Sequence, residues 1–280
     1  MRTITDTAQM MAEARALRAA GQRIGFVPTM GFLHHGHTSL MRQARPLCDT
    51  LVVSIYVNPL QFAPTEDLDR YPRDPVGDLA QCEEAGVDLV FMPGELYAPE
   101  HSTRVRVSGV SEGLCSGTRP HFFEGVATVV ARLFGLVKPH VAVFGEKDYQ
   151  QLRVIQQMVA DLAMDIDVVG GPLVRDGDGV ALSSRNAYLS PEERVRARSL
   201  HRALFAMRDA ARQGERDVGA LLERGRALLD VDALDYLEVR DGLSLRPLTE
   251  LPELPERPPR ALVAAFVGRT RLIDNTGLGS

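Results

Sequence analysis

From Ile24 to Val169, short runs of β-branched and other apolar residues alternate with amphipathic helical stretches. Continuous apolar runs are typical of strands buried on both faces, and helices between them favour a parallel sheet. The predicted strands are Ile24–Val27, Leu51–Val57, Asp88–Met92, Val141–Phe144 and Ile166–Val169. The predicted helices between them are Thr38–Cys48, Val76–Ala85, Val126–Val137 and Tyr149–Leu162. We therefore predict a doubly wound α/β domain, in which ligands bind at the carboxyl ends of the strands.

The pattern changes after Pro172, where a polar connector, Val174–Asn186, begins. The Ser190-Pro-Glu-Glu193 segment then predicts the start of a long charged helix, because Ser is a favoured N-cap and Pro and acids favour the first turn. The remaining predicted elements are a helix at Val218–Leu229 and strands at Ala233–Val239, Ala261–Val267 and Arg271–Ile273. We therefore predict two domains, residues 1–173 and a smaller α+β domain of residues 174–280.

The chain has 280 residues, of which 45% are hydrophobic and 25% are charged, and its net charge is −5. A mildly acidic chain is a poor candidate for general binding to nucleic acid or to membrane surfaces. Its three cysteines, Cys48, Cys82 and Cys115, have no CxxC spacing and favour a reducing compartment. No signal-peptide pattern and no apolar run of about 20 residues is visible. We therefore expect a cytoplasmic protein.

Pro-Thr-Met-Gly-Phe-Leu-His-His-Gly-His, residues 28–37, directly follows the first predicted strand. His34 and His37 are three residues apart and can share a face at a helix start, where backbone N–H groups and the helix dipole favour an anion. Gly36 lets a ligand approach the backbone. This arrangement suits a polyphosphate. A metal site and an ordinary pair of loop histidines are the alternatives, although no nearby carboxylate or cysteine completes a set of metal ligands.

Polar motifs also follow the second and fourth predicted strands, Asn58–Phe62 and Gly145–Asp148. Lys147 can reach a phosphate, and Asp148 can hold a metal-bound water or a hydroxyl group. Other candidates from composition are the hydroxyl-rich Ser183-Ser184-Arg185 for a triphosphate, the amides of Gln61 and Gln151 for a small hydroxy acid, and Arg119 for an anion. Each of these could equally be an ordinary surface residue.

Neither GxxxxGK nor GxGxxG occurs, which argues against a P-loop and a standard dinucleotide site. One G-x-S-x-G string occurs at Gly109–Gly113. A nucleophilic serine in that motif needs a helix directly after it, and we predict that the chain continues as a loop at Leu114–Gly117. We therefore interpret the string as a chance match.

Five motifs in order resemble those of the pantothenate synthetase (pantoate–β-alanine ligase) family. They are Pro28-Thr-Met-Gly-x-Leu-His-x-Gly-His37, Val57-Asn-Pro-x-Gln-Phe62, Tyr71-Pro-Arg73, Phe144-Gly-Glu-Lys-Asp-Tyr-Gln-Gln151 and Ser183-Ser-Arg-Asn186. The family belongs to the HxGH nucleotidyltransferases. The resemblance implies a Rossmann-like domain with a smaller C-terminal domain, a homodimer, and the ATP-dependent joining of pantoate to β-alanine with release of AMP and pyrophosphate. Its partners would be these small molecules, with Mg²⁺ held mainly by the ATP phosphates.

The resemblance also implies roles for individual residues. The catalytic residues would be His34, His37 and Lys147. The ATP-binding residues would be Met30, Gly31, Phe32, Leu33, His34, His35, Gly36, His37, Gly145, Glu146, Lys147, Asp148, Val174, Leu182, Ser183, Ser184 and Arg185. Gln61 and Gln151 would bind pantoate, and Gln61 would also contact β-alanine. The alternatives are a nucleotidyltransferase that stops at the nucleotidylated product, a nucleotide-sensing module and a metallohydrolase.

One segment departs from the family pattern Arg-Pro-x-His-Phe-x-Gly-Val. In Arg119-Pro-His-Phe-Phe-Glu-Gly-Val126, Phe122 stands where the family usually has histidine, and His121 directly precedes it. Arg119, Gly125 and Val126 keep their places. The sequence leaves open whether His121 takes over the role of a histidine at this position.

Overall fold

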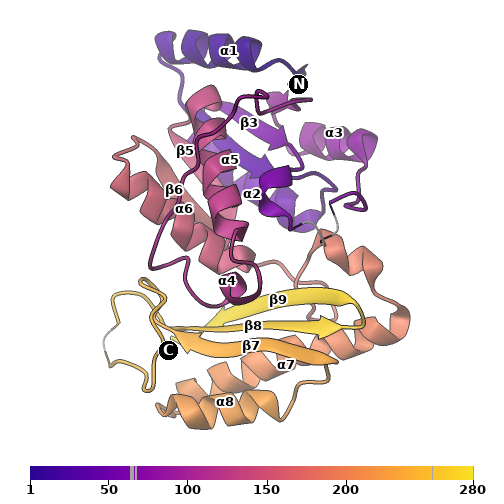
Figure 1. Cartoon of the computed structure of the whole chain (residues 1–280), viewed down its shortest axis with the longest axis vertical. Helices are drawn as coiled ribbons and strands as arrows, with labels where there is room; N and C mark the ends of the chain where they lie inside the picture. The colour runs from indigo at the N-terminus through magenta and orange to yellow at the C-terminus, as the bar shows by residue number, and fades with distance from the viewer. Residues whose placement is uncertain (64–65, 67, 254, 280) are drawn as a thin grey trace.

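The computed structural model describes residues 1–63, 66, 68–253 and 255–279. Six parallel strands form the main sheet, in the spatial order β1-β4-β3-β2-β5-β6 (Figure 1). Their bounds are β1 Arg2–Ile4, β2 Ile24–Thr29, β3 Thr50–Ile55, β4 Leu89–Phe91, β5 Val141–Gly145 and β6 Asp167–Gly171. The predicted parallel sheet is therefore confirmed. The short strand β1 gives too weak a pattern for prediction from sequence, and β3 ends two residues earlier than predicted.

Helices pack on both faces of this sheet, which gives the predicted Rossmann-like arrangement (Figure 1). The helices of this part of the chain are α1 Thr7–Ala19, α2 His35–Ala44, α3 Pro75–Glu84, α4 Cys115–Thr118, α5 Phe122–Val137 and α6 Tyr149–Asp161. Neighbouring strand residues face opposite cores: Phe26 packs with α1, α5 and α6, and Val27 packs with α2 and α3. Strands that are buried on both faces explain the continuous apolar runs in the sequence.

The order of the strands reverses at β2, which pairs with β3 on one side and with β5 on the other. The chain moves outward from β2 through β3 to β4, then returns across the sheet to β5. Crossover connections therefore diverge between the carboxyl ends of β2 and β5. A crevice at such a point is the usual ligand site of open α/β sheets. The His34–His37 segment and the Lys147 segment start at these two strand ends.

The C-terminal part of the chain forms a three-stranded antiparallel sheet with two helices packed on one face of it (Figure 1). Its elements are α7 Pro191–Arg212, α8 Val218–Arg226, β7 Ala233–Arg240, β8 Arg260–Val267 and β9 Thr270–Gly277. Ser190 caps α7 as predicted, in a reciprocal arrangement with Glu193. This part has its own core between α7, α8 and the sheet. The boundary between residues 173 and 174 stays a prediction, because Leu245 and Leu262 pack into the core of the first domain.

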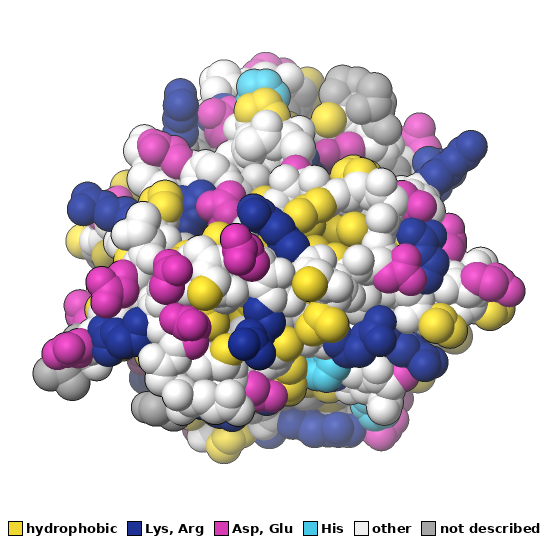
Figure 2. Space-filling model, turned by 90° about the horizontal axis from the view of Figure 1, so that it is seen from below, with side chains coloured by type: hydrophobic (Ala, Val, Ile, Leu, Met, Phe, Trp, Pro, Cys, Tyr) yellow, Lys and Arg dark blue, Asp and Glu magenta, His cyan; other side chains and the backbone are white. Residues whose placement is uncertain are grey.

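Figure 2 shows the molecule from the side of this C-terminal part. Acidic and basic side chains are interspersed there, and neither sign forms a broad patch. On α7, Arg194 pairs with Asp178, and Arg196 pairs with Asp230 and Asp232. This mixture is typical of a solvated surface. Within the described ranges, none of the helices has the length and apolar composition to cross a bilayer.

Candidate active site

A cavity of about 270 Å³ lies at the carboxyl edge of the main sheet, where β2 and β5 end. We name two parts of its lining: the strand-end wall, from residues 28–37, 58–62 and 145–151, and the connector wall, from residues 172–186. The predicted site residues that line the cavity are Met30, His34, Gly36, His37, Gln61, Gly145, Lys147, Asp148, Gln151, Val174, Leu182, Ser183, Ser184 and Arg185. Motifs that are widely separated in the sequence therefore meet around one space.

The turn that leads from β2 to the histidines is held by a buried carboxylate. Gly31 and Phe32 have φ angles of +82° and +50°, in the left-handed region that glycine adopts readily and phenylalanine does not. Asp78 on α3 accepts hydrogen bonds from the N–H of Phe32 at 2.9 Å and of Leu33 at 2.6 Å. Burial raises the pKa of Asp78, and these two N–H groups oppose the shift. A residue of a different helix thus stabilises the strained turn.

His34 and His37 lie at the N-terminus of α2, with their ring centroids 4.1 Å apart. Nδ1 of His34 accepts from the Gly36 N–H at 3.2 Å, and Nδ1 of His37 accepts from the His34 N–H at 3.3 Å. Because both Nδ1 atoms accept hydrogen bonds, each neutral ring carries its proton on Nε2 and has that proton to donate to a ligand. A Cβ atom at Gly36 would lie 2.9 Å from Cε1 of His34, so glycine allows the ring to fold back over the helix start.

Burial lowers the pKa of His34 to about 4 and that of His37 to about 3, and the positive charge of Lys147 contributes to both shifts. The two rings are therefore neutral donors at neutral pH. Lys147 follows β5 and supplies the positive charge, with its Nζ 3.7 Å from Oδ2 of Asp148. A helix N-terminus, two neutral donors and an ammonium group together form a suitable site for a polyphosphate.

The connector wall reaches the strand-end wall through Ser184, whose hydroxyl donates to the carbonyl oxygen of Phe32 at 3.3 Å. The preceding Ser183 hydroxyl accepts from the Arg185 N–H at 3.3 Å, which stabilises the turn that carries both serines. Earlier in the connector, Arg175 and Ala181 form an isolated antiparallel bridge. The connector is thus a short hairpin followed by a turn, and the turn faces the histidines.

The far end of the strand-end wall carries amide groups instead of charges. Gln61 is buried, and its Oε1 accepts from Nδ2 of Asn58 at 3.0 Å. Asn58 is fixed in turn, because its Nδ2 donates to the Gly125 carbonyl and its Oδ1 accepts from the Tyr97 hydroxyl at 2.9 Å. Nε2 of Gln61 is therefore directed toward Met30, whose sulfur lies 3.2 Å away. This end can recognise a small molecule with hydroxyl and carboxylate groups.

The family model described as pantoate-beta-alanine ligase matches residues 2–277. The chain belongs to the pantoate–β-alanine ligase family. It is 50% identical to the pantothenate synthetase of Pelobacter propionicus over 284 aligned residues, which cover 100% of this chain and 99% of that relative. It is also similar in structure to the pantothenate synthetase of Thermus thermophilus, with a TM-score of 0.93, 48% identity and full coverage of both chains.

A more distant structure of the same family comes from Francisella tularensis and is complexed with beta-gamma ATP and beta-alanine. Its TM-score with this chain is 0.80, its identity is 29%, and the alignment covers 100% of this chain and 98% of the other. The shared fold therefore extends over the whole pantoate–β-alanine ligase chain, including both walls of the cavity.

The departure from the ligase family pattern lies on the cavity itself. Phe122 lines the cavity, and the guanidinium of Arg119 lies 3.8 Å from the centre of its ring. Arg119 also forms two 2.6 Å hydrogen bonds with the Glu66 carboxylate. His121 is exposed at the start of α5 and does not line the cavity. His121 therefore does not take the place that Phe122 occupies.

Five of the predicted ATP-binding residues do not line the cavity: Gly31, Phe32, Leu33, His35 and Glu146. The first three form the turn held by Asp78, His35 is exposed, and Glu146 pairs with Arg260 of β8 at 3.0 Å. Their direct contact with ATP stays a prediction.

Two residues that shape the site, Asn58 and Asp78, are not among the predicted site residues. Asn58 stands in a quoted motif, and an Asn-Pro pair after a strand is a recognisable capping signal, since its side chain accepts from the Leu60 N–H. Asp78 lies inside a helix and gives no local signal. The loop predicted at Leu114–Gly117 was wrong, because α4 begins at Cys115. The hydroxyl of Ser111 nevertheless donates to the Val107 carbonyl and has no basic partner there.

Proposed function

We propose that this protein condenses pantoate with β-alanine in an ATP-dependent reaction that passes through pantoyl adenylate. One observation carries the proposal: a single cavity is lined both by His34, His37 and Lys147, which suit phosphate groups, and by the amides of Gln61 and Gln151, which suit a small acid. The α-phosphate of ATP and the carboxylate of a small acid would meet between them. Membership of the pantoate–β-alanine ligase family supports pantoate as that acid.

In the first step, a carboxylate oxygen of pantoate forms a bond to the α-phosphorus of ATP, and the bond to pyrophosphate breaks. Negative charge grows on the phosphoryl oxygens during this step. The Nε2–H groups of the two histidines, the α2 N-terminus and the Lys147 ammonium are fixed before the reaction and can stabilise that charge without reorganisation. Because the histidines are neutral, they contribute as hydrogen-bond donors and Lys147 contributes the formal charge.

In the second step, the amine of β-alanine attacks the acyl carbon of the adenylate, and AMP leaves with the carboxylate oxygen. Gln61 would hold the pantoyl group during both steps, because Asn58 fixes its amide from behind. Among the described residues that line the cavity, no Ser or Cys donates a hydrogen bond to a base that could activate it for an acyl-enzyme. The sulfur of Cys115 lies 3.3 Å from the Tyr236 hydroxyl and 3.6 Å from Nη2 of Arg271, and neither group is a general base.

Magnesium fits this site as a partner of the ATP phosphates. Among the residues that the structure describes, no group of three or more His, Cys, Asp or Glu side chains could hold a metal ion. The carboxylate of Asp148 lines the cavity beside Lys147 and could accept hydrogen bonds from metal-bound water. When bound with ATP, Mg²⁺ would neutralise part of the phosphate charge.

Isotope exchange tests the proposed order of steps. Pantoate and ATP alone should support exchange of labelled pyrophosphate into ATP, and ¹⁸O in the pantoate carboxylate should appear in AMP after the full reaction. Exchange that requires β-alanine, together with unlabelled AMP, would exclude the adenylate. An enzyme that accumulates the adenylate and ignores β-alanine would instead be a nucleotidyltransferase.

The family resemblance also supports a homodimer in the cytoplasm. Sedimentation of the purified protein at micromolar concentration is the direct test, with a mass of twice 30.7 kDa as the expected result. A monomer over the whole concentration range would contradict this part of the proposal.

A further inference from the structure

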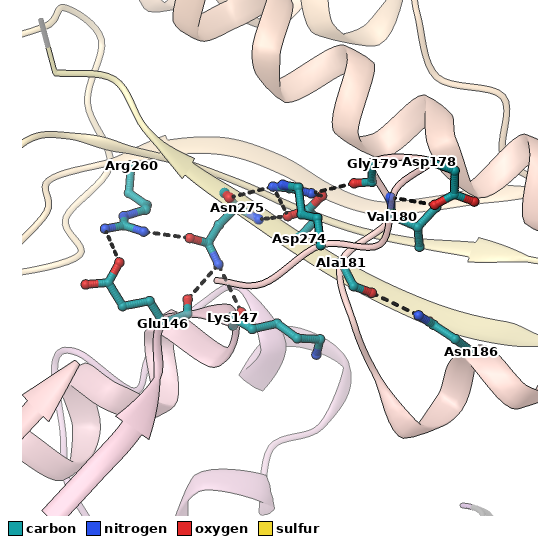
Figure 3. Close-up of polar contacts among 11 residues, drawn as sticks. Glu146, Lys147, Asp178, Gly179, Val180, Ala181, Asn186, Arg260, Asp274 and Asn275 are labelled. Carbon is teal, nitrogen blue, oxygen red and sulfur yellow. Dashed lines mark hydrogen bonds and ion pairs between the residues drawn. The ribbon is translucent and has the colours of Figure 1, made fainter. Parts of the chain in front are cut away.

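Asn275, on the edge strand β9 of the C-terminal sheet, contacts the backbone of the Lys147 segment. Its side chain is buried, and its Nδ2 donates to the carbonyl oxygens of Glu146 and Lys147, both at 2.9 Å (Figure 3). These carbonyls belong to the 3₁₀ turn between β5 and α6. One side-chain amide from a distant part of the chain therefore holds the backbone that carries the proposed catalytic lysine.

The orientation of this amide is fixed by Arg260 on β8. Nη1 of Arg260 donates to Oδ1 of Asn275 at 2.8 Å, and Nη2 pairs with Oε2 of Glu146 at 3.0 Å. Since a guanidinium can only donate, the oxygen of Asn275 must face Arg260 and its NH₂ group must face the two carbonyls. The guanidinium also lies 3.9 Å from the ring centre of Tyr149, which restricts it further.

The preceding residue, Asp274, holds the other wall of the cavity. Its carboxylate accepts two hydrogen bonds from Arg175, at 2.6 Å and 2.8 Å, and only 3% of its side-chain surface is exposed. Arg175 also donates to the Gly179 carbonyl within the connector hairpin. Two successive residues of β9 thus contact both segments that approach the phosphate-binding end of the cavity.

We propose that Asn275 is a positioning residue, which sets the Lys147 ammonium for the ATP phosphates through the backbone of residues 146–147. This inference rests on the proposed role of Lys147 in ATP binding. In Figure 3, the Lys147 side chain extends away from Asn275. Asn275 also lines the cavity, but its NH₂ group is engaged by the two carbonyls and its oxygen by Arg260, so it acts on Lys147 through the backbone. Asp274 holds the connector wall through Arg175, and β9 therefore contacts both walls.

The test compares Asn275→Asp and Asn275→Ala with the wild-type enzyme. Asp is close to Asn in shape and still accepts from Arg260, but it cannot donate to the two carbonyls. Ala removes both functions without adding charge. Each variant should raise the ATP dissociation constant, measured by calorimetry, by about tenfold, which is the size of effect expected for one or two lost hydrogen bonds. The KM for pantoate and the KM for β-alanine should change by less than about twofold, since residues 58–61 are not touched.

Gln213→Glu is the matched control for added charge, because Gln213 is exposed at the end of α7. It should leave ATP binding unchanged. A weakening confined to Asn275→Asp, with Asn275→Ala equal to wild type, would be an electrostatic effect and would overturn the positioning role. Equal losses in the affinities of all three substrates, together with a lower melting temperature, would show a purely structural residue and would also overturn it.

A double-mutant cycle with Lys147→Ala decides whether Asn275 acts through the lysine. If it does, Asn275→Ala should change ATP affinity by less than about twofold once Lys147 is absent, because the effects of coupled residues are not additive. Independent effects that multiply would overturn the inference. Pyrophosphate exchange by the wild-type enzyme is measured first. Absence of that exchange contradicts the proposed function, whereas normal exchange with unaffected Asn275 variants contradicts only the role of Asn275.

Discussion

The two walls of the cavity are built in different ways. The strand-end wall continues directly from β2, β3 and β5, and its conformation is fixed by buried groups such as Asp78 and Asn58. The connector wall belongs to neither sheet. It is held by side-chain contacts, from Ser184 to Phe32 and from Arg175 to Asp274. A sheet edge gives precise placement, and a connector held by side chains adapts more easily.

The two walls also differ in the groups that they carry. The histidines and Lys147, which would meet developing charge, lie on the strand-end wall. The connector wall offers two serine hydroxyls and Arg185, which suit a nucleotide that must enter and leave. Electrostatic stabilisation of a transition state depends on donors that are already in place, so the rigid wall is the suitable location for them.

The largest effect should come from removing a donor of the strand-end wall. We expect His34→Ala, His37→Ala and Lys147→Ala each to lower turnover by about 10²–10³-fold, as for other lost transition-state donors. The two histidine variants should lose only about 1 kcal/mol of stability, because each ring satisfies one backbone N–H group at the start of α2. Lys147→Arg should rescue only in part, because a planar fork replaces a compact ammonium. Steady-state release of AMP and thermal unfolding are the measurements.

The matched control for the histidines is His121→Ala, since His121 is exposed and lies off the cavity. It should keep wild-type turnover. Folded His34 and His37 variants with near-normal rates would show that the rigid wall does not carry the chemistry, and the contrast between the two walls would fail.

The next largest effect should come from the support behind that wall. Asp78→Asn puts an NH₂ group against one of the two backbone N–H donors, so a buried donor loses its acceptor. We expect a loss of about 2–3 kcal/mol in the free energy of unfolding. Turnover should also fall, because the turn at Gly31 and Phe32 sets the start of α2. Urea unfolding and AMP release test both.

Asp74→Asn is the matched control on the same helix, because Asp74 caps α3 through the Gly77 N–H and Asn is an equally good cap. It should change the free energy of unfolding very little. A stable, fully active Asp78→Asn variant would mean that the left-handed turn needs no support from α3.

The contrast between the walls also explains how much the sequence could predict. The strand-end motifs are predictable because apolar runs indicate buried strands. Polar residues that directly follow parallel strands lie at the same edge of the sheet. The parallel sheet and the meeting of His34, Gln61 and Lys147 at one cavity follow from that pattern. Naming pantoate needed the family resemblance, because an amide pair fits many small acids.

The contacts that hold the walls could not be predicted from the sequence. Asp78 meets the N–H groups of Phe32 and Leu33 from a helix 45 residues further on, and an acid near a helix start is ordinarily a capping residue. Asn275 looks like any polar residue of a short strand. Its role depends on how the C-terminal sheet sits against the end of β5, and no local pattern encodes that placement.

A smaller effect is expected at the acid-binding end of the same wall. Gln61→Ala should raise the KM for pantoate by about tenfold and weaken the use of β-alanine, while the ATP dissociation constant stays unchanged. Separate calorimetric titrations with ATP and pantoate distinguish these effects. Gln213→Ala, at an exposed position, is the control. Lost ATP affinity with normal pantoate affinity would reverse the assignment of the two ends.

The two walls should also respond differently to acid. The pKa values of His34 and His37, about 4 and 3 in the folded protein, lie below the ordinary value of 6.5. At pH values between about 4 and 6.5, these two histidines therefore bind more protons in the unfolded chain than in the folded protein. The stability that the neutral rings contribute is complete above pH 6.5 and is lost as the pH falls toward 4.

On the connector wall, the hydrogen bond from Arg194 lowers the pKa of Asp178 to about 2. Its contribution is complete above about pH 4 and is lost only as the pH falls toward 2. Between pH 7 and pH 5, the stability contributed by the histidines of the strand-end wall should therefore decrease, whereas that contributed by the Arg194–Asp178 pair should not change. We expect the wild-type protein to lose about 1–3 kcal/mol more in this interval than a His34→Gln/His37→Gln variant, after allowance for the partial exposure of the rings. Urea unfolding at the two pH values measures the difference, and parallel pH curves for the two proteins would show that the histidines are not held neutral by burial.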